Sequence, residues 1–122
     1  MTTDELKART KQFALRVVTL VEVLSDSVRG RVIADQITRS ATSVGANYRA
    51  TCRARSRAEF IAKIGVVEEE ADETDFWLEL IIESKIRRAK QILPLLNEAN
   101  ELVAIMAASR KSAIANRRLA IR

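Results

Sequence analysis

The sequence predicts an all-α fold, a single antiparallel up-down four-helix bundle that spans residues 1–122. Only three Gly and one Pro occur among 122 residues, and a β-rich fold would need more turn residues than these. Apolar residues recur at three- and four-residue spacings in four successive segments, which is typical of amphipathic helices. The sequence has no internal repeat, low-complexity segment or domain boundary. One bundle with short links fits these observations.

The first two helices are expected at about residues 4–24 and 31–55, joined by the link SDSVRG. Thr2 and Glu5 have the spacing of a capping box before the first helix. The second helix contains the stretch SATSVGANYRA at residues 40–50, which is small and polar for a helix interior. Gly45 costs roughly 1 kcal/mol relative to Ala within a helix, so we expect another helix to pack closely there.

The third and fourth helices are expected at about residues 57–83 and 88–112. Ser56 and Glu59 have the spacing of a second capping box. Pro94 is unfavourable deep inside a helix, so the fourth helix either begins in effect near Leu93 or is kinked there. Residues 113–122 are expected to form a basic tail, of which NRRLAIR at residues 116–122 is expected to fray when alone.

Basic and acidic residues are segregated along the chain, whose net charge is +5. Residues 29–63 hold eight basic and two acidic residues, and residues 64–84 hold eight acidic residues and no basic one. Residues 85–122 hold nine basic and two acidic residues. Such segregation indicates a charged binding surface, or pairing between segments or subunits.

Several function classes lack the residues that they need. The chain has no His, the commonest general base and metal ligand, and Cys52 therefore lacks a base to activate it as a nucleophile. One Cys fits a reducing cytoplasm, and neither a signal peptide nor a run of about 20 apolar residues is present. We expect a cytoplasmic protein that is not an enzyme, has no catalytic residue or cofactor, and does not enter a membrane.

The acidic segment has two interpretations. Glu69, Glu70 and Glu73 share a helix face at three- and four-residue spacings, and with Asp72 they are candidate ligands for Mg²⁺ or Ca²⁺. Bundles with two metal ions also use His, which is absent here. A solvated or ion-paired face is therefore the favoured interpretation, and we predict no metal site.

Two groups of basic residues are candidate nucleic-acid contacts. Arg49, Arg53 and Arg57 are four residues apart, so we expect them on one face at the end of the second helix, with Arg55 beside them. Arginine binds phosphate through its planar fork, but this row also suits pairing with acidic residues 68–83 of the same or a neighbouring chain. The second group lies in the C-terminal segment, for which a membrane surface, a neighbouring subunit and solvent are alternatives. It consists of Arg110, Lys111, Arg117 and Arg118.

Three motifs in order give the chain a family resemblance. They are RSATSVGAN at residues 39–47, A-x-S-x-x-E-F-x-x-K at residues 54–63 and E-A-x-E-T-x-x-W-L at residues 70–78. Over roughly residues 5–110 the sequence closely resembles the four-helix bundle protein family, also called the 23S rRNA intervening-sequence proteins.

The resemblance implies a small bacterial protein with an up-down four-helix bundle that assembles as a ring of five copies. It implies no enzymatic activity, and a distant relationship to a basic accessory protein of diversity-generating retroelements that binds nucleic acid. Many relatives have Glu shortly after the Asn of the GAN motif, where this chain has Arg49 or Ala50. Many also have Pro after the first helix. The first departure makes this face more basic.

The same motifs indicate a structural polar clasp, either inside the bundle or between subunits. They place Arg39, Ser43 and Asn47 on the second helix, and Glu70 and Glu73 on the third. A buried Arg needs a carboxylate partner, so we expect Arg39 to pair with Glu73 or, failing it, with Glu70.

Two functions fit these observations. The first is a non-catalytic oligomeric adaptor that binds the phosphates of RNA or DNA, with a ring that repeats each basic patch. The alternative is a protein–protein interaction scaffold that binds no nucleic acid. The location of the Arg row on the assembled ring separates the two, because exposure there favours nucleic acid and burial at an interface favours the scaffold.

Overall fold

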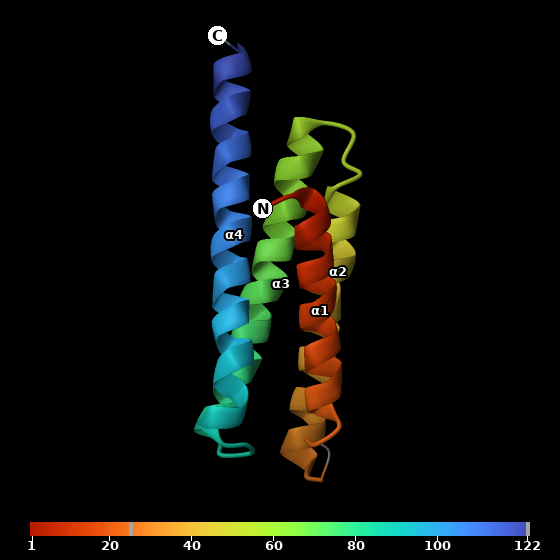
Figure 1. Ribbon diagram of the computed structural model, residues 1–122, viewed down its shortest axis with the longest axis vertical. Coiled ribbons are helices and arrows are strands. Elements are labelled where there is room, and N and C mark those ends of the chain that lie inside the picture. The colour runs from red at the N-terminus through yellow and green to blue at the C-terminus, as the bar shows by residue number, and fades with distance from the viewer. Residues whose placement is uncertain (25, 122) are drawn as a thin grey trace.

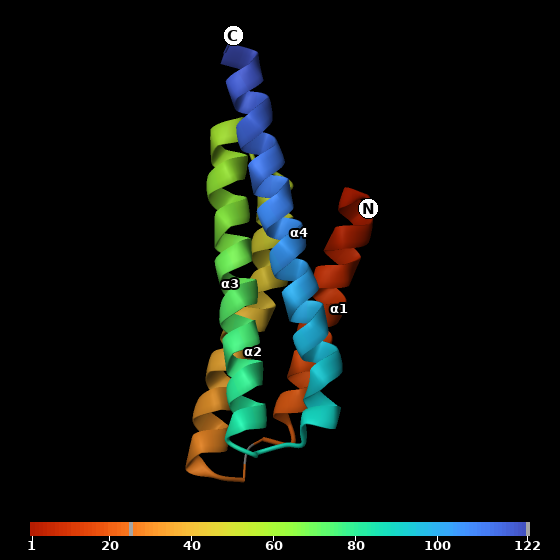
Figure 2. The ribbon, with the colours of Figure 1, turned by 90° about the vertical axis from the view of Figure 1, so that its left-hand side faces the viewer.

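The computed structural model is an antiparallel four-helix bundle (Figures 1 and 2). It describes residues 1–24 and 26–121, with their side chains as far as Asn116. Within these residues there are four helices and no strand. The helices are α1 (Thr3–Val21), α2 (Val28–Thr51), α3 (Arg57–Glu83) and α4 (Ala89–Ile121). The bundle fold predicted from the helical periodicity is confirmed.

The hydrophobic core lies between all four helices. Phe13, Ile37, Leu78 and Leu102 come from α1, α2, α3 and α4 in turn, and each is at most 1% exposed. Burying a side chain of this size stabilises the fold by about 1.5–3 kcal/mol. The third helix packs against both α2 and α4, whereas α1 packs mainly on α2 and contacts α4 least. Figure 2 shows α1 leaning away from α4 toward its N-terminus.

Polar caps and short turns set the ends of α1 and α2. The capping box of Thr2 and Glu5 is confirmed, with hydrogen bonds of 3.1 and 3.3 Å. The regular helix ends at Val21 rather than at residue 24, because the next N–H groups bond to carbonyls three residues back. The second helix begins at Val28 rather than at residue 31, because the Ser27 hydroxyl accepts the Gly30 N–H at 3.0 Å.

The α2–α3 loop, residues 52–56, explains why α2 ends at Thr51 rather than at residue 55. The Ala54 N–H bonds to the Thr51 carbonyl at 3.1 Å and turns the chain. Ser56 is extended, and its hydroxyl accepts the Glu59 N–H at 3.0 Å as the N-cap of α3. These residues are needed to reverse the chain, so they cannot continue the helix.

The fourth helix is longer than expected. It begins at Ala89, with Pro94 inside it, so the helix does not start near Leu93. It ends at Ile121, beyond residue 112, and the backbone of residues 113–121 is helical rather than frayed. The C-terminal part of α4 extends past the other three helices (Figures 1 and 2). No helix in the described part of the chain is long and apolar enough to cross a membrane.

The bundle has two different ends (Figures 1 and 2). The turn end contains the turn that joins α1 to α2 and the turn that joins α3 to α4. The loop end contains the α2–α3 loop, the N-terminus of α1 and the C-terminal part of α4. The candidate functional residues gather at the loop end.

Candidate nucleic-acid interface

Four arginines meet at the loop end, although not as a row on one helix. Arg49 lies in the last turn of α2, Arg53 and Arg55 lie in the loop, and Arg57 is the first residue of α3. The prediction of a single helical face is therefore wrong, because α2 ends at Thr51. All four side chains are exposed. We call them the loop-end arginines.

The loop-end arginines have no acidic partner within the residues that the structure describes. The acidic residues of α3 that form ion pairs have other partners there. Glu70 and Glu73 pair with Arg39, and Glu68 pairs with Arg110. Pairing of these arginines with the acidic segment of the same chain is therefore not observed. The positive charge of the loop end stays uncompensated.

The second group of candidate contacts is less available. The Arg110 Nε donates to a Glu68 carboxylate oxygen at 3.0 Å, which joins α4 to α3. Lys111 is exposed beside it. The side chains of Arg117 and Arg118 lie outside the described residues.

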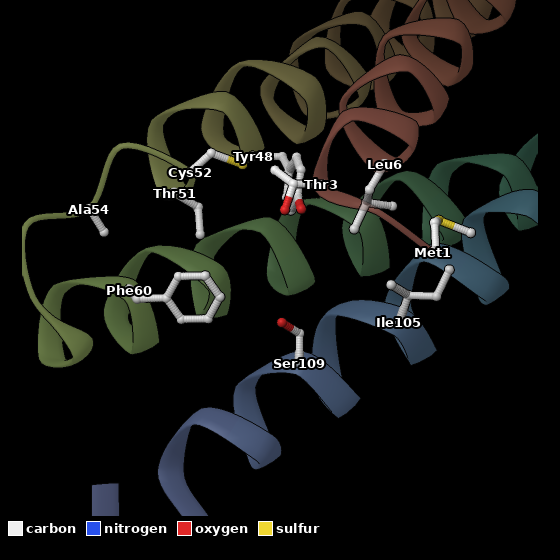
Figure 3. Close-up of a pocket in the computed structure, with 10 residues that line it drawn as sticks. All are labelled: Met1, Thr3, Leu6, Tyr48, Thr51, Cys52, Ala54, Phe60, Ile105 and Ser109. Atoms are coloured by element: carbon white, nitrogen blue, oxygen red, sulfur yellow. The ribbon is translucent and has the colours of Figure 1, made fainter. Parts of the chain in front are cut away.

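A hollow of about 420 Å³ opens next to the α2–α3 loop, and we call it the loop-end hollow (Figure 3). All four helices and the loop contribute to its wall. In Figure 3, Phe60 of α3 and Ser109 of α4 reach toward the same space. The lining residues are Met1, Thr3, Leu6, Tyr48, Thr51, Cys52, Ala54, Phe60, Ile105 and Ser109. Their side chains include no Asp, Glu, Lys or Arg, so the wall is apolar with hydroxyl groups set into it.

Tyr48 forms the inner wall of this hollow and is 7% exposed. Burial raises the pKa of its phenol to about 12, and a hydrogen bond with Cys52 acts in the same direction. A hydrogen bond with Thr3 acts on the pKa of Tyr48 in the opposite direction and is the smallest of these causes. The phenol therefore stays protonated and neutral near pH 7.

Two further hollows, of about 410 and 480 Å³, flank the loop-end hollow. One is lined by Arg53, Arg55 and Lys63 with Glu59 and Ala50, on the other side of the loop. The second is lined by Arg57, Ser112, Ala113 and Asn116, and it shares Phe60 and Ser109 with the loop-end hollow. Sequence reasoning missed Phe60, Lys63 and Ser109 as site residues. Phe60 and Lys63 follow Arg57 on α3, whereas Ser109 is brought beside them by the packing of α4 against α3.

The residues of the predicted polar clasp form two separate sets of contacts. Arg39 donates to both Glu70, at 3.1 Å, and Glu73, across the surface of α2 and α3. The Arg39 side chain is 47% exposed, so the expectation that it is buried is wrong for the single chain. The Trp77 N–H, which donates at 3.1 Å, and then Arg39 lower the pKa of Glu73. Asn47 instead donates to the Ser43 carbonyl within α2, at 2.9 Å.

The small residues of α2 have a structural role that the sequence predicted only in part. Ser40 is fully buried, and the Thr74 hydroxyl lies 2.8 Å from it across the α2–α3 contact. Gly45 faces the backbone of α1, where an added Cβ would lie 3.5 Å from the Thr10 carbonyl oxygen. This is ordinary contact, so the approach of α1 to α2 is close without requiring glycine.

The acidic segment also contains a buried carboxyl group. Asp75 is 7% exposed, and its Oδ1 has no hydrogen-bond partner among the residues that the structure describes. Burial, and then a hydrogen bond with Glu79, raise the pKa of Asp75 to about 6. In the described part of the chain, no three Cys, Asp or Glu side chains converge as a metal-binding group.

An ion-pair cluster joins α1 to α4 in addition to their shared hydrophobic core. Arg9 donates to both carboxylate oxygens of Glu98, at 2.7 and 2.6 Å, and to Glu101 at 3.0 Å. The Arg9 hydrogen bond lowers the pKa of Glu98. Such a two-pronged pair fixes geometry well. On each helix, the ion-paired residues lie nearer the turn end than the residues that line the loop-end hollow. Figure 2 shows α1 and α4 diverging toward the N-terminus of α1.

Comparison with known proteins agrees with the fold. The sequence model described as 23S rRNA-intervening sequence protein matches residues 4–108. A crystal structure of a protein of unknown function from the S23 ribosomal protein family of Bacteroides thetaiotaomicron is similar, with a TM-score of 0.84 and 35% sequence identity. The alignment covers 91% of this chain and 99% of the other. No protein with a curated description matches the sequence.

Proposed function

The chain belongs to the 23S rRNA-intervening sequence protein family, as the resemblance of its motifs indicated, and we propose that it is a non-catalytic, oligomeric adaptor that binds RNA or DNA through phosphates. The loop-end arginines are the proposed primary contacts. Lys111, Arg117 and Arg118 are proposed secondary contacts, with Arg110 contributing where its pair with Glu68 opens.

One observation carries this proposal. The loop-end arginines are exposed and have no acidic partner in the described chain, while Arg39 and Arg110 are paired with carboxylates. A cluster of unpaired guanidinium groups attracts an anion that repeats along a chain, and a nucleic-acid backbone is such an anion. Within the loop-end cluster, contact is expected to depend on charge and little on base sequence.

The adaptor is proposed to act as a ring of several copies, five by the family resemblance. Large apolar side chains exposed on the single chain support self-association: Leu15 is 52% exposed and Phe76 is 51% exposed. A ring would present the loop-end arginines once per subunit, so that weak single contacts add up to strong binding. Light scattering on the purified protein measures the number of subunits.

A scaffold that binds only proteins is the second candidate. It is favoured by Phe76, whose exposed ring meets Trp77 edge to face with ring centres 5.1 Å apart, among acidic residues of α3. An apolar ring within a charged surface is typical of a protein–protein contact. In this case the loop-end arginines would be covered by acidic surfaces of a partner.

Fluorescence anisotropy of labelled RNA and DNA across a salt series tests the adaptor. We expect binding that weakens steeply with salt. Replacing Arg53, Arg55 and Arg57 together by Gln is expected to weaken binding at least about tenfold and to reduce the salt slope by about 2, because each lost phosphate contact removes about 0.7–0.9 from that slope.

A charge-matched variant controls for net charge alone. Lys85, Arg88 and Lys90 are exposed at the turn end, and replacing all three by Gln removes the same charge from the other end of the bundle. We expect this control to bind nearly as well as the unmodified protein. Equal losses in the two variants would place the contact elsewhere, and absence of binding at low salt by a folded oligomer would favour the scaffold.

A further inference from the structure

The loop-end hollow is lined by neutral side chains that have no role in binding phosphate. Its wall contains the aromatic ring of Phe60 and the hydroxyl groups of Thr3, Tyr48, Thr51 and Ser109. The Thr51 hydroxyl already donates to the Asn47 carbonyl, at 2.8 Å, which leaves its oxygen as an acceptor. The Tyr48 phenol is neutral at pH 7 because its pKa is about 12. A ligand for this wall is itself neutral, partly apolar and able to exchange hydrogen bonds along one edge.

The α2–α3 loop places this neutral wall beside the hollow that Arg53 and Arg55 line. Alternate residues of the loop belong to different hollows: Cys52 and Ala54 line the loop-end hollow, whereas Arg53 and Arg55 line the hollow on the other side. On the α4 side, Arg57 lines the hollow that shares Phe60 and Ser109 with the loop-end hollow. Cationic side chains therefore border the neutral space on two sides.

A nucleotide of a single strand also combines a charged part with a neutral, partly apolar part. Its phosphate is anionic, and its base is flat, uncharged and edged with hydrogen-bonding groups. Proteins that bind single strands combine a positive surface for the backbone with aromatic side chains on which bases stack. An unpaired base is free to leave the stack and enter a pocket, whereas a base within a duplex is not.

We propose that the loop-end hollow receives an unpaired base of single-stranded nucleic acid. The base lies against Phe60 (Figure 3), and the neighbouring phosphates are held by Arg53, Arg55 and Arg57. The Ser109 hydroxyl faces the edge of the base, and Tyr48 and Thr51, which are 7% and 1% exposed, form the floor of the hollow behind it. This inference rests on the proposed binding of nucleic acid, and it adds a preference for single strands that carry bases.

The test compares three ligands of equal length on the full chain: a labelled single strand, the same strand with abasic sites, and the duplex. The intact strand is expected to bind about tenfold or more tightly than the abasic strand, because stacked bases add to the phosphate contacts. Phe60→Leu keeps an apolar side chain in the packing. It is expected to abolish this tenfold preference while leaving affinity for the abasic strand unchanged.

Ser109→Phe is a second variant, which fills the hollow from α4 and leaves Phe60 in place. It is expected to remove the same preference, and thermal melting checks that each variant is folded. Cys52, the only cysteine, provides a separate readout. Its alkylation is expected to slow when the intact strand is bound, and not when the abasic strand is bound.

The negative results of these experiments separate failure of the base pocket from failure of nucleic-acid binding itself. Equal affinity for the intact and abasic strands would overturn the base pocket and leave the phosphate adaptor standing. A full preference retained by both folded variants would also overturn the pocket. Absence of binding to all three ligands at low salt would overturn the proposed function and this inference with it.

Discussion

The turn end and the loop end of this bundle differ in how tightly the chain is packed where it reverses. At the turn end, an Arg87 guanidinium N–H donates to the Val23 carbonyl and ties the α3–α4 turn to the end of α1. Leu24 is 2% exposed there, and its carbonyl oxygen lies so close to Gly30 that a Cβ added at Gly30 would be 1.8 Å from it. The turn end also has two hollows, of about 330 and 310 Å³, and the Arg87 Nε there has no hydrogen-bond partner in the described chain. At the loop end, the wall of a 420 Å³ hollow is open and the arginines have no acidic partner in the described chain.

This difference separates stability from binding. The turn end has little room for change at Gly30, where an added Cβ would meet the Leu24 backbone. The loop end keeps an open hollow beside exposed arginines that water solvates, and these are features that a ligand can fill and pair with. Substitution of Gly30 is therefore expected to change folding, and substitutions of the loop-end arginines to change binding.

The largest effect on stability is expected from Gly30→Ala, which disturbs the turn between α1 and α2. An added Cβ would lie 1.8 Å from the Leu24 carbonyl oxygen, a backbone atom that cannot move aside without displacing buried Leu24. We expect a loss of about 3 kcal/mol in the free energy of unfolding, measured by urea denaturation. Gly45→Ala is the matched control, because its Cβ fits at 3.5 Å from Thr10 and improves helix propensity. Equal stability losses in the two variants would contradict the difference between the sites.

A smaller effect, dependent on pH, is expected from Asp75→Asn in the acidic segment between the two ends. The pKa of Asp75 is about 6 in the folded chain and 3.8 ordinarily, so the folded state binds the proton more tightly. Stability should therefore fall as the pH rises from about 4 to about 6 and remain lower above that range. Asn cannot ionise, and we expect it to raise stability by about 1–2 kcal/mol at pH 7. Denaturation at pH 4 and pH 7 measures this, and an unchanged pH dependence would contradict it.

The smallest effect, a gain, is expected from Lys85→Gly at the turn end. Lys85 follows α3 with φ of 61°, and the Ile86 N–H bonds to the Ile81 carbonyl at 3.2 Å, which is the pattern of a helix end that favours glycine. Removing the Cβ relieves the left-handed conformation, so the free energy of unfolding should rise by about 0.5–1 kcal/mol. Thermal melting measures the gain. Arg88→Gly, outside the left-handed residue, is expected to give none.

Prediction from the sequence succeeded where spacing alone determines the outcome. The capping box of Thr2 and Glu5 and the helical periodicity are local, so no tertiary information was needed. It failed at the end of α2, because the spacing of Arg49, Arg53 and Arg57 fits a helix whether or not the chain turns at Thr51. The pairing of Arg39 with both carboxylates depends on the register of α2 against α3, which the spacing within either helix does not determine.

The sequence by itself determined the helices, the segregation of charge and the family motifs, because these depend on residues that are near one another in the chain. Only the tertiary structure decided which charges are paired. Folding brings Glu68 to Arg110 and Glu73 to Arg39, and it leaves the loop-end arginines without such partners in the described chain. It also decided that Phe60, Ser109 and Tyr48 enclose one space, since α2, α3 and α4 meet there only in the packed bundle.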